Sequence, residues 1–140
     1  MGTVQNLRST VQNLDPGARL GDVQALAQAI AYGQGLQTTN GVTASTTQTQ
    51  AAGTQLQYGI NVIGTSANAA DAVKAPQALP GTILIIANNG GNTVTLFPTV
   101  GDTLNDAAQD AGIVVADNTV SIYVCGAAGQ WFGGAITLET

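Results

Sequence analysis

The chain has 140 residues, of which 44% are hydrophobic and only 8% are charged, and its formal net charge is −5. Because an ordinary soluble domain is about 25% charged, this surface has little to keep copies apart in water, and we expect other chains to cover much of it. Only 3 residues are basic, which argues against nucleic acid or an anionic membrane as a partner. The composition therefore favours a component of an assembly over a freely diffusing enzyme.

The first expected element is an arm over residues 1–37. The sequence Thr-Val-Gln-Asn-Leu occurs at 3–7 and again at 10–14, which gives apolar residues the alternating spacing of a heptad seam. Asp-Pro-Gly at 15–17 interrupts the pattern, and a second amphipathic stretch follows, with Asp22 as a plausible N-cap. These short helices could pack on their own domain or dock on another protein, and we favour docking because no nearby segment resembles a core that they could cover. The predicted docking residues are Val4, Leu7, Val11, Leu14, Val23, Leu26 and Ile30.

Residues 38–57 are rich in Thr, Gln and Ala and contain neither a charge nor an apolar period. Such a composition is typical of a linker or an extended chain. Gln and Thr side chains could form hydrogen bonds between chains stacked about a symmetry axis. We therefore predict a polar extended linker between the arm and a third zone, residues 58–140.

The sequence pattern of this third zone is typical of β strands. Residues 82–87 are apolar on both faces, which predicts a strand buried on both sides. The run Asn-Asn-Gly-Gly-Asn at 88–92 is a strong turn signal, and residues 93–97 return as an alternating strand with Val94 and Leu96 on one face. Pro98 ends that strand, because proline cannot donate to a sheet ladder.

A second hairpin is expected from residues 113–116 and 120–124, with Val120, Ile122 and Val124 facing inward. A closing strand should run from Trp131 to Leu138, and residues 104–111 form either a short helix or a wide loop. Evenly spaced short strands with glycine-rich turns predict a mainly β fold: a small antiparallel sandwich or jelly-roll-like module behind the helical arm.

Few residues could carry catalysis, since the chain has no histidine and 1 cysteine. Asp102, Asp106 and Asp110 recur at four-residue spacing and could share one helical face; we favour a solvated acidic face over a cation site with oxygen ligands. Cys125 lies in an apolar strand without a histidine to activate it, which favours a small buried side chain. We predict no catalytic, cofactor or metal site.

The order of motifs in residues 58–133 resembles a known module. Leu-Pro-Gly at 79–81 and a strand ending in Asn88 are followed by Val-Thr-Leu-Phe-Pro at 94–98, Gly-Asp-Thr-Leu-Asn at 101–105 and Gly-Gln-Trp at 129–131. This order is similar to a β-rich module of bacteriophage head fibres, capsid decoration (cement) proteins and some tail-fibre segments. Phe and Leu stand at 97 and 104, where the pattern usually has Tyr and Ile. The resemblance implies a homotrimeric virion component.

Trp131 is the one large anchor in an aromatic-poor chain, and we expect it in the core or in a contact between subunits, with a sugar-stacking platform as the less favoured reading. The residues expected in the module core or in trimer packing are Ile83, Ile85, Val94, Leu96, Pro98, Val120, Ile122, Val124 and Trp131.

The expected function is that of a structural virion protein, a homotrimeric capsid decoration, cement or head-fibre protein that binds the major capsid protein. The sequence shows no recognisable export signal and no apolar run of the ~20 residues that a membrane span needs, so we expect synthesis in the host cytoplasm and a final place on the capsid surface. The alternative is a tail-fibre or receptor-binding segment that contacts host glycans. A small enzyme or a non-viral adhesin fits less well.

Overall fold

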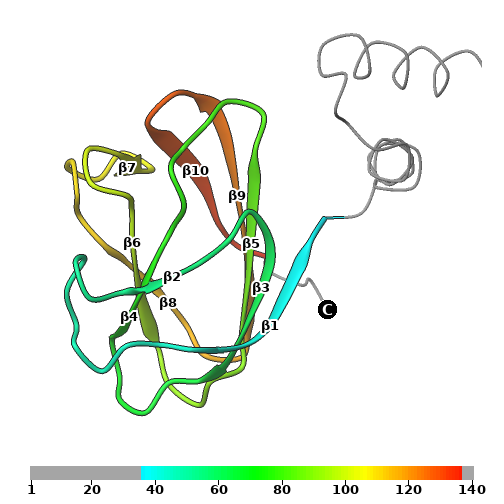
Figure 1. Cartoon of the computed structure of the whole chain (residues 1–140), viewed down its shortest axis with the longest axis vertical. Coiled ribbons are helices and arrows are strands. Elements are labelled where there is room, and N and C mark those ends of the chain that lie inside the picture. Colours follow the sequence, from blue (N-terminus) through cyan, green and yellow to red (C-terminus); the bar gives the residue numbers. More distant parts are fainter. Residues whose placement is uncertain (1–35, 137–140) are drawn as a thin grey trace, which may run out of the picture. The chain divides into compact units, whose positions relative to one another are not determined.

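The computed structural model describes residues 36–136, and all regular structure in this part is β strand (Figure 1). Within this part, residues 37–136 belong to one compact unit. The strands are β1 (Thr38–Thr43), β2 (Thr54–Gln55), β3 (Gly59–Thr65), β4 (Asp71–Lys74), β5 (Ile83–Asn88), β6 (Val94–Phe97), β7 (Thr103–Leu104), β8 (Ile113–Val115), β9 (Thr119–Ala127) and β10 (Gln130–Ala135). They form a large sheet, β1-β3-β5-β9-β10-β7, and a small sheet, β2-β4-β6-β8.

The first six strands are the rungs of a short β-solenoid. The chain passes from the large sheet to the small sheet and back, so that β1, β3 and β5 stack in parallel in one sheet and β2, β4 and β6 stack in parallel in the other. The register aligns Thr38 with Ile60 and Ile60 with Ile85. The mainly β prediction is confirmed, but the antiparallel sandwich or jelly-roll arrangement is wrong, because the coils stack in parallel.

The turn signals were the source of this error. Residues 88–92 do not close a hairpin: they form a corner that carries the chain from β5 in the large sheet to β6 in the small sheet. Residues 116–118 likewise form a corner, between β8 and β9. Only after these coils does the chain reverse, with β8 antiparallel to β6 and β9 antiparallel to β5.

The end of the fold differs in detail from the prediction. β10 is a hairpin partner of β9 and ends at Ala135, while residues 137–140 lie outside the described part. Residues 104–111 are a wide loop after β7, not a helix.

Residues 38–57 belong to the first coil and are not a linker. Their polar side chains bond to neighbouring segments of the same chain: the Gln48 amide donates to the carbonyl of Ala69 at 2.7 Å, and the Gln50 amide donates to the carbonyl of Pro98 at 2.9 Å. These bonds tie an uncharged, weakly apolar stretch to the later coils.

The core lies between the two sheets. Leu84, Ile86 and Tyr123 reach it from the large sheet, and Val73 and Leu96 reach it from the small sheet, each at most 2% exposed. Burying such side chains contributes roughly 1.5–3 kcal/mol each against the entropy of folding. Because successive side chains of a strand point to opposite faces of the sheet, the residues that alternate with these core residues lie on the outer side of each sheet.

Asn88 ties the two corners together at the end of the core. Its side-chain amide lies 3.0 Å from the carbonyl oxygen of Asn92 and 3.2 Å from that of Val115, and its Oδ1 accepts from the N–H of Gly90 at 3.1 Å. Asn88 is 1% exposed, so its amide cannot form hydrogen bonds with water. These intramolecular bonds take their place.

Candidate functional site

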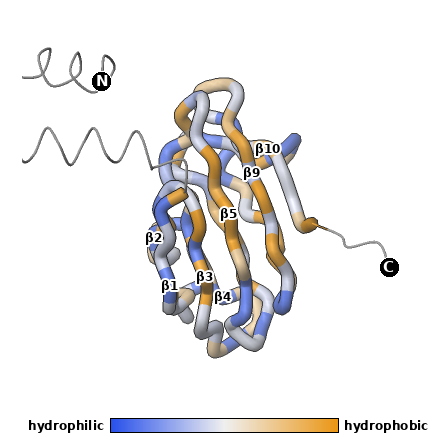
Figure 2. Tube along the Cα trace, turned by 90° about the vertical axis from the view of Figure 1, so that its right-hand side faces the viewer, coloured by the Kyte–Doolittle hydropathy of each residue, from blue (hydrophilic) through white to orange (hydrophobic). Residues whose placement is uncertain are grey.

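The outer side of the large sheet is the most unusual surface of the described part. Its strands place apolar residues in three cross-strand rows. We define the outer apolar face by these residues: Ile83, Val124 and Phe132 in the first row, Ile60, Ile85 and Ile122 in the second, and Val62, Ala87, Val120 and Ile136 in the third. Figure 2 looks onto this sheet and shows hydrophobic residues along β3, β5 and β9.

Several of these side chains are well exposed. Val124 is 48% exposed, Phe132 is 41% exposed and Ile83 is 37% exposed. The prediction that Val120, Ile122 and Val124 face inward is therefore wrong for the single chain. Ser121, Tyr123 and Cys125 take the inward positions of β9 instead. Whether the outward residues pack in a trimer stays a prediction.

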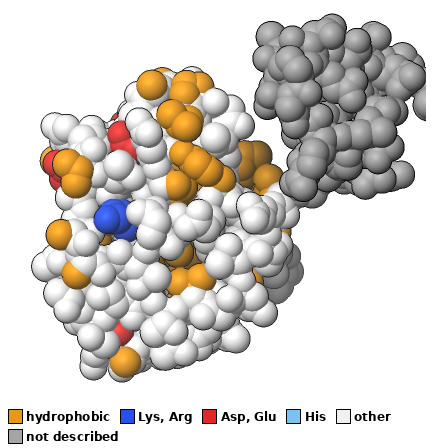
Figure 3. Space-filling view, viewed as in Figure 1, with side chains coloured by type: hydrophobic (Ala, Val, Ile, Leu, Met, Phe, Trp, Pro, Cys, Tyr) orange, Lys and Arg blue, Asp and Glu red, His pale blue; other side chains and the backbone are white. Residues whose placement is uncertain are grey.

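No charged residue lies in a strand of the large sheet. The charged residues of the described part are Asp71 and Lys74 on β4 of the small sheet, and Asp102, Asp106, Asp110 and Asp117 in loops. Charged side chains are accordingly sparse on the surface in view in Figure 3. An apolar sheet face without charge has nothing on it that favours water over another protein surface.

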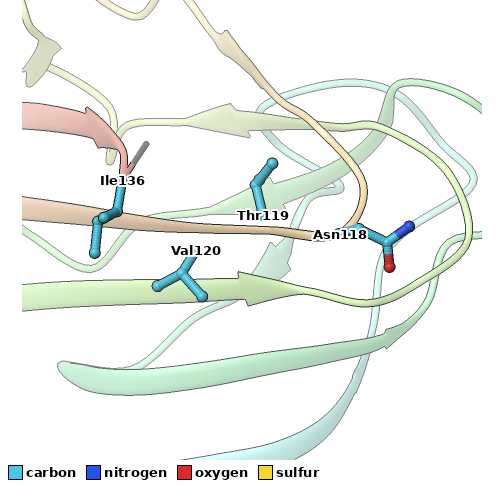
Figure 4. Close-up of a pocket in the computed structure, with 4 residues that line it drawn as sticks. All are labelled: Asn118, Thr119, Val120 and Ile136. Atoms are coloured by element: carbon cyan, nitrogen blue, oxygen red, sulfur yellow. The ribbon is translucent and has the colours of Figure 1, made fainter. Parts of the chain in front are cut away.

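A shallow pocket of about 300 Å³ opens at one end of this face (Figure 4). Asn118 and Thr119 line it together with Val120 and Ile136 of the third row. The backbone N–H of Ile136 donates to the carbonyl of Val120 at 2.8 Å, which holds the two side chains side by side. None of these four side chains is titratable, so they offer no group for acid–base chemistry.

The remaining predicted core residues lie inside. Val94, Leu96 and Trp131 are fully buried, and Pro98 is buried after β6. The indole N–H of Trp131 donates to the carbonyl of Pro76 at 3.1 Å, and its ring centroid lies 6.5 Å from that of Tyr58. A residue so enclosed cannot offer a platform for a sugar. The predicted docking residues of the arm, Val4, Leu7, Val11, Leu14, Val23, Leu26 and Ile30, lie outside the described residues.

The aspartates at 102, 106 and 110 do not share a helical face. Asp102 Oδ2 accepts the N–H of Ala78 at 2.8 Å, and Asp110 Oδ1 accepts the N–H of Gly101 at 2.7 Å. Among residues 36–136 no group of three or more metal-ligating side chains is present. Asp102 and Asp110 therefore hold loop backbone.

Hydrogen bonds also set the titration of two carboxyl groups. The backbone N–H of Gly101, followed by the Gln50 amide, holds the pKa of Asp110 below its usual value. The pKa of Asp71 is lowered, first of all by the backbone N–H of Asn68. Both carboxylates stabilise turns in their ionised form.

Cys125 and Tyr123 are buried residues on the inward side of β9. Cys125 is a buried free thiol whose Sγ lies 3.1 Å from the carbonyl oxygen of Ala127. Burial raises the pKa of the Tyr123 hydroxyl above its ordinary value. Both groups are packing residues.

Sequence reasoning missed five members of the outer apolar face: Ile60, Val62, Ala87, Phe132 and Ile136. The sequence signal for this face lies in β5. Its successive positions are apolar, which predicts burial on both sides. Its inner side is buried against the core, whereas on its outer side Ile83 is exposed and Ile85 is half-buried in the single chain. A covering layer is thus what the sequence pattern indicates and the described part lacks.

Within residues 36–136 there is no helix long and apolar enough to cross a membrane. Comparison with family models, curated proteins and solved structures finds no match to this chain.

Proposed function

We propose that this chain is a structural protein of a bacteriophage particle, a homotrimeric decoration, cement or head-fibre protein that binds and stabilises the capsid. The observation that carries the proposal is the outer apolar face. The largest contiguous apolar patch of a soluble protein is often an interaction site, and this face spans β3, β5, β9 and β10 without a charge. Such a surface is expected where a protein works inside an assembly.

The proposed mechanism is thermodynamic. Apolar surface removed from water at subunit contacts stabilises the assembly by about 25 cal/mol per Å², and a protein that binds only the intact shell shifts the equilibrium toward that shell. Three linked arms would bind far more tightly than one, because the second and third contacts form at high effective concentration. The short solenoid supplies a stiff body that carries the arms.

The resemblance of residues 58–133 to phage head-fibre and decoration modules supports the same proposal. The alternative of a glycan-binding tail segment calls for exposed aromatic and acidic loop residues at the tip of the module, and only 4% of the chain is aromatic. Trp131, the one tryptophan, is fully buried and offers no sugar platform, so we propose the capsid role.

The test is binding of the full chain to empty capsids of its phage. The double variant Leu7→Asp/Leu14→Asp places charges in the apolar stripe of the arm, and we expect it to lose capsid binding. The matched control, Asn6→Asp/Asn13→Asp, adds the same charges at the neighbouring position of each repeat and should bind like the wild type. Equal binding by both double variants would contradict docking through the arm, and wild-type protein that binds no capsid would contradict the function.

A further inference from the structure

We infer that the outer apolar face is the surface through which copies of this chain associate, with the row Ile83–Val124–Phe132 at its centre. This inference rests on the proposed homotrimer and names the surface that forms it. The occupant of the face is a second copy of this chain.

The relief of the face fits a copy of itself. Val124 and Phe132 protrude as the most exposed pair of the first row. Two positions further along each strand lie Gly126 and Gly134, and a Cβ placed at either would meet no atom within 4 Å. A ridge of Val and Phe thus lies beside hollows that lack side chains. Ridges that enter hollows are the general way in which two protein surfaces reach the packing density of an interior.

The size of the face is too small for a simple pair of copies and suits an assembly around a common axis. Four strands about 4.8 Å apart and about six residues long, at about 3.4 Å per residue, present roughly 400 Å² in projection. A stable protein interface buries about 800 Å² per partner. One such face, paired once, falls short of a strong dimer, whereas faces that meet around a common axis also bury the rims beside them.

Charge excludes the other common kinds of partner. A nucleic acid, an anionic lipid surface or an acidic peptide would need cations on the face, and Lys74, the one lysine of the chain, lies on the small sheet. The chain itself supplies a surface of matching character, apolar and uncharged. The arm, residues 1–35, is the competing occupant, and the experiments below separate it from a second copy.

The first experiment compares the same substitution on the two sheets. Val124→Asp puts a charge in the outer apolar face, and Val114→Asp puts one on β8 of the small sheet, where Val114 is 71% exposed. By native mass spectrometry and sedimentation of the full chain, we expect Val124→Asp to weaken association roughly 100-fold or more, since an unpaired carboxylate would be buried in the contact. Val114→Asp should assemble like the wild type. Equal assembly, or equal dissociation, of the two variants would overturn the inference.

The second experiment needs no variant and therefore stands even if Val124→Asp fails to fold. Hydroxyl-radical labelling of the assembled full chain compares Phe132 on the outer apolar face with Phe97 on the small sheet. In the single chain Phe132 is exposed and Phe97 is half-buried, so uncovered protein labels Phe132 at least as strongly. We expect the order to reverse in the assembly, with Phe132 labelled several-fold less than Phe97. Unchanged labelling order would overturn the inference, as would protection of Phe132 in a monomeric chain, which would identify the arm as the cover.

The two proposals fail in different ways. If the Val124→Asp variant still assembles and still coats capsids, the inference is contradicted and the proposed function stands. If Val124→Asp dissociates the assembly but the wild-type protein binds no capsid, the proposed function is contradicted and the inference stands.

Discussion

The outer face of the large sheet and the outer face of the small sheet are built on the same core from neighbouring coils, and they differ sharply. The large sheet presents rows of Ile, Val and Phe. The small sheet presents the row Gln55–Lys74–Phe97, and beside it Thr95 and Val114, whose row partner Ala72 is buried. Mixed rows of this kind are ordinary for a solvated sheet, whereas the apolar rows are those of a sheet with a second layer to meet. The difference is why we propose that a second layer covers the large sheet.

The largest expected effect is a difference in unfolding free energy between an inward-facing and an outward-facing variant of β10. Trp131→Ala removes the largest core side chain and should lower the free energy of unfolding by about 3–5 kcal/mol, measured by urea denaturation. Phe132→Ala, the next residue of β10, points outward and should cost the single chain less than about 1 kcal/mol while weakening association. Similar losses of unfolding free energy for both variants would contradict the inward and outward assignment of β10.

The neighbouring glycines Gly133 and Gly134 test the placement of β10 against β9 through the backbone. A Cβ at Gly133 would collide with the carbonyl of Ile122, and the Asn105 side chain holds the other side of Gly133 through bonds of 2.9 and 3.0 Å to its N–H and carbonyl. Gly133→Ala should therefore destabilise the fold by about 2 kcal/mol or more.

Gly134→Ala is the control for that variant, since its Cβ meets no atom within 4 Å. It should leave thermal unfolding of the single chain nearly unchanged and weaken association by partly filling a hollow of the outer apolar face. Equal destabilisation of the single chain by both alanines would show that β10 does not approach β9 as described.

The corner that sends the chain from one sheet to the other has its own test. Asn88→Ala leaves the carbonyls of Asn92 and Val115 without their donor, and we expect a loss of about 1–3 kcal/mol in unfolding free energy. Asn89→Ala, at the exposed next position, should change it by less than about 0.5 kcal/mol. Equal effects would indicate that the Asn88 amide does not hold the two corners.

The smallest expected effect is acid sensitivity. Hydrogen bonds lower the pKa of Asp71 and Asp110 below the usual value of an aspartate carboxyl, so the unfolded chain takes up these protons first as the pH falls. The stabilisation is complete above the unfolded-state pKa and is lost as the pH falls through the lower, folded-state pKa. Thermal unfolding followed from pH 6 downward should show this loss. The variant Asp71→Asn/Asp110→Asn should show a flatter acid profile, and an unchanged profile would contradict the role of these carboxylates.

Much of the local structure was predictable from the sequence. The strand at 82–87, the turn at 88–92 and the burial of Val94, Leu96 and Trp131 all agree with the structure, because alternation and turn composition are local signals. The pairing of strands was not predictable in this way. An Asn- and Gly-rich turn permits either a hairpin or a corner, and only contacts between distant coils select the corner.

The outer apolar face shows a second limit. In β9, Val120, Ile122 and Val124 alternate with Ser121, Tyr123 and Cys125, and hydropathy alone assigned the more apolar set to the inside. The structure buries the other set instead: Tyr123 is one of the largest buried side chains, and Ser121 and Cys125 are buried beside it in β9. Hydropathy indicates how many faces of a strand must be covered, but it does not indicate which face meets the chain's own core.

The most direct test of the central claim is an isotope-filtered NOE measurement on assemblies mixed from labelled and unlabelled full chain. The account predicts contacts from the methyl groups of Ile83 and Val124 in one copy to the ring of Phe132 in another. Observation of intermolecular contacts that involve only the small sheet, or of a chain that stays monomeric with these methyl groups in water, would contradict it.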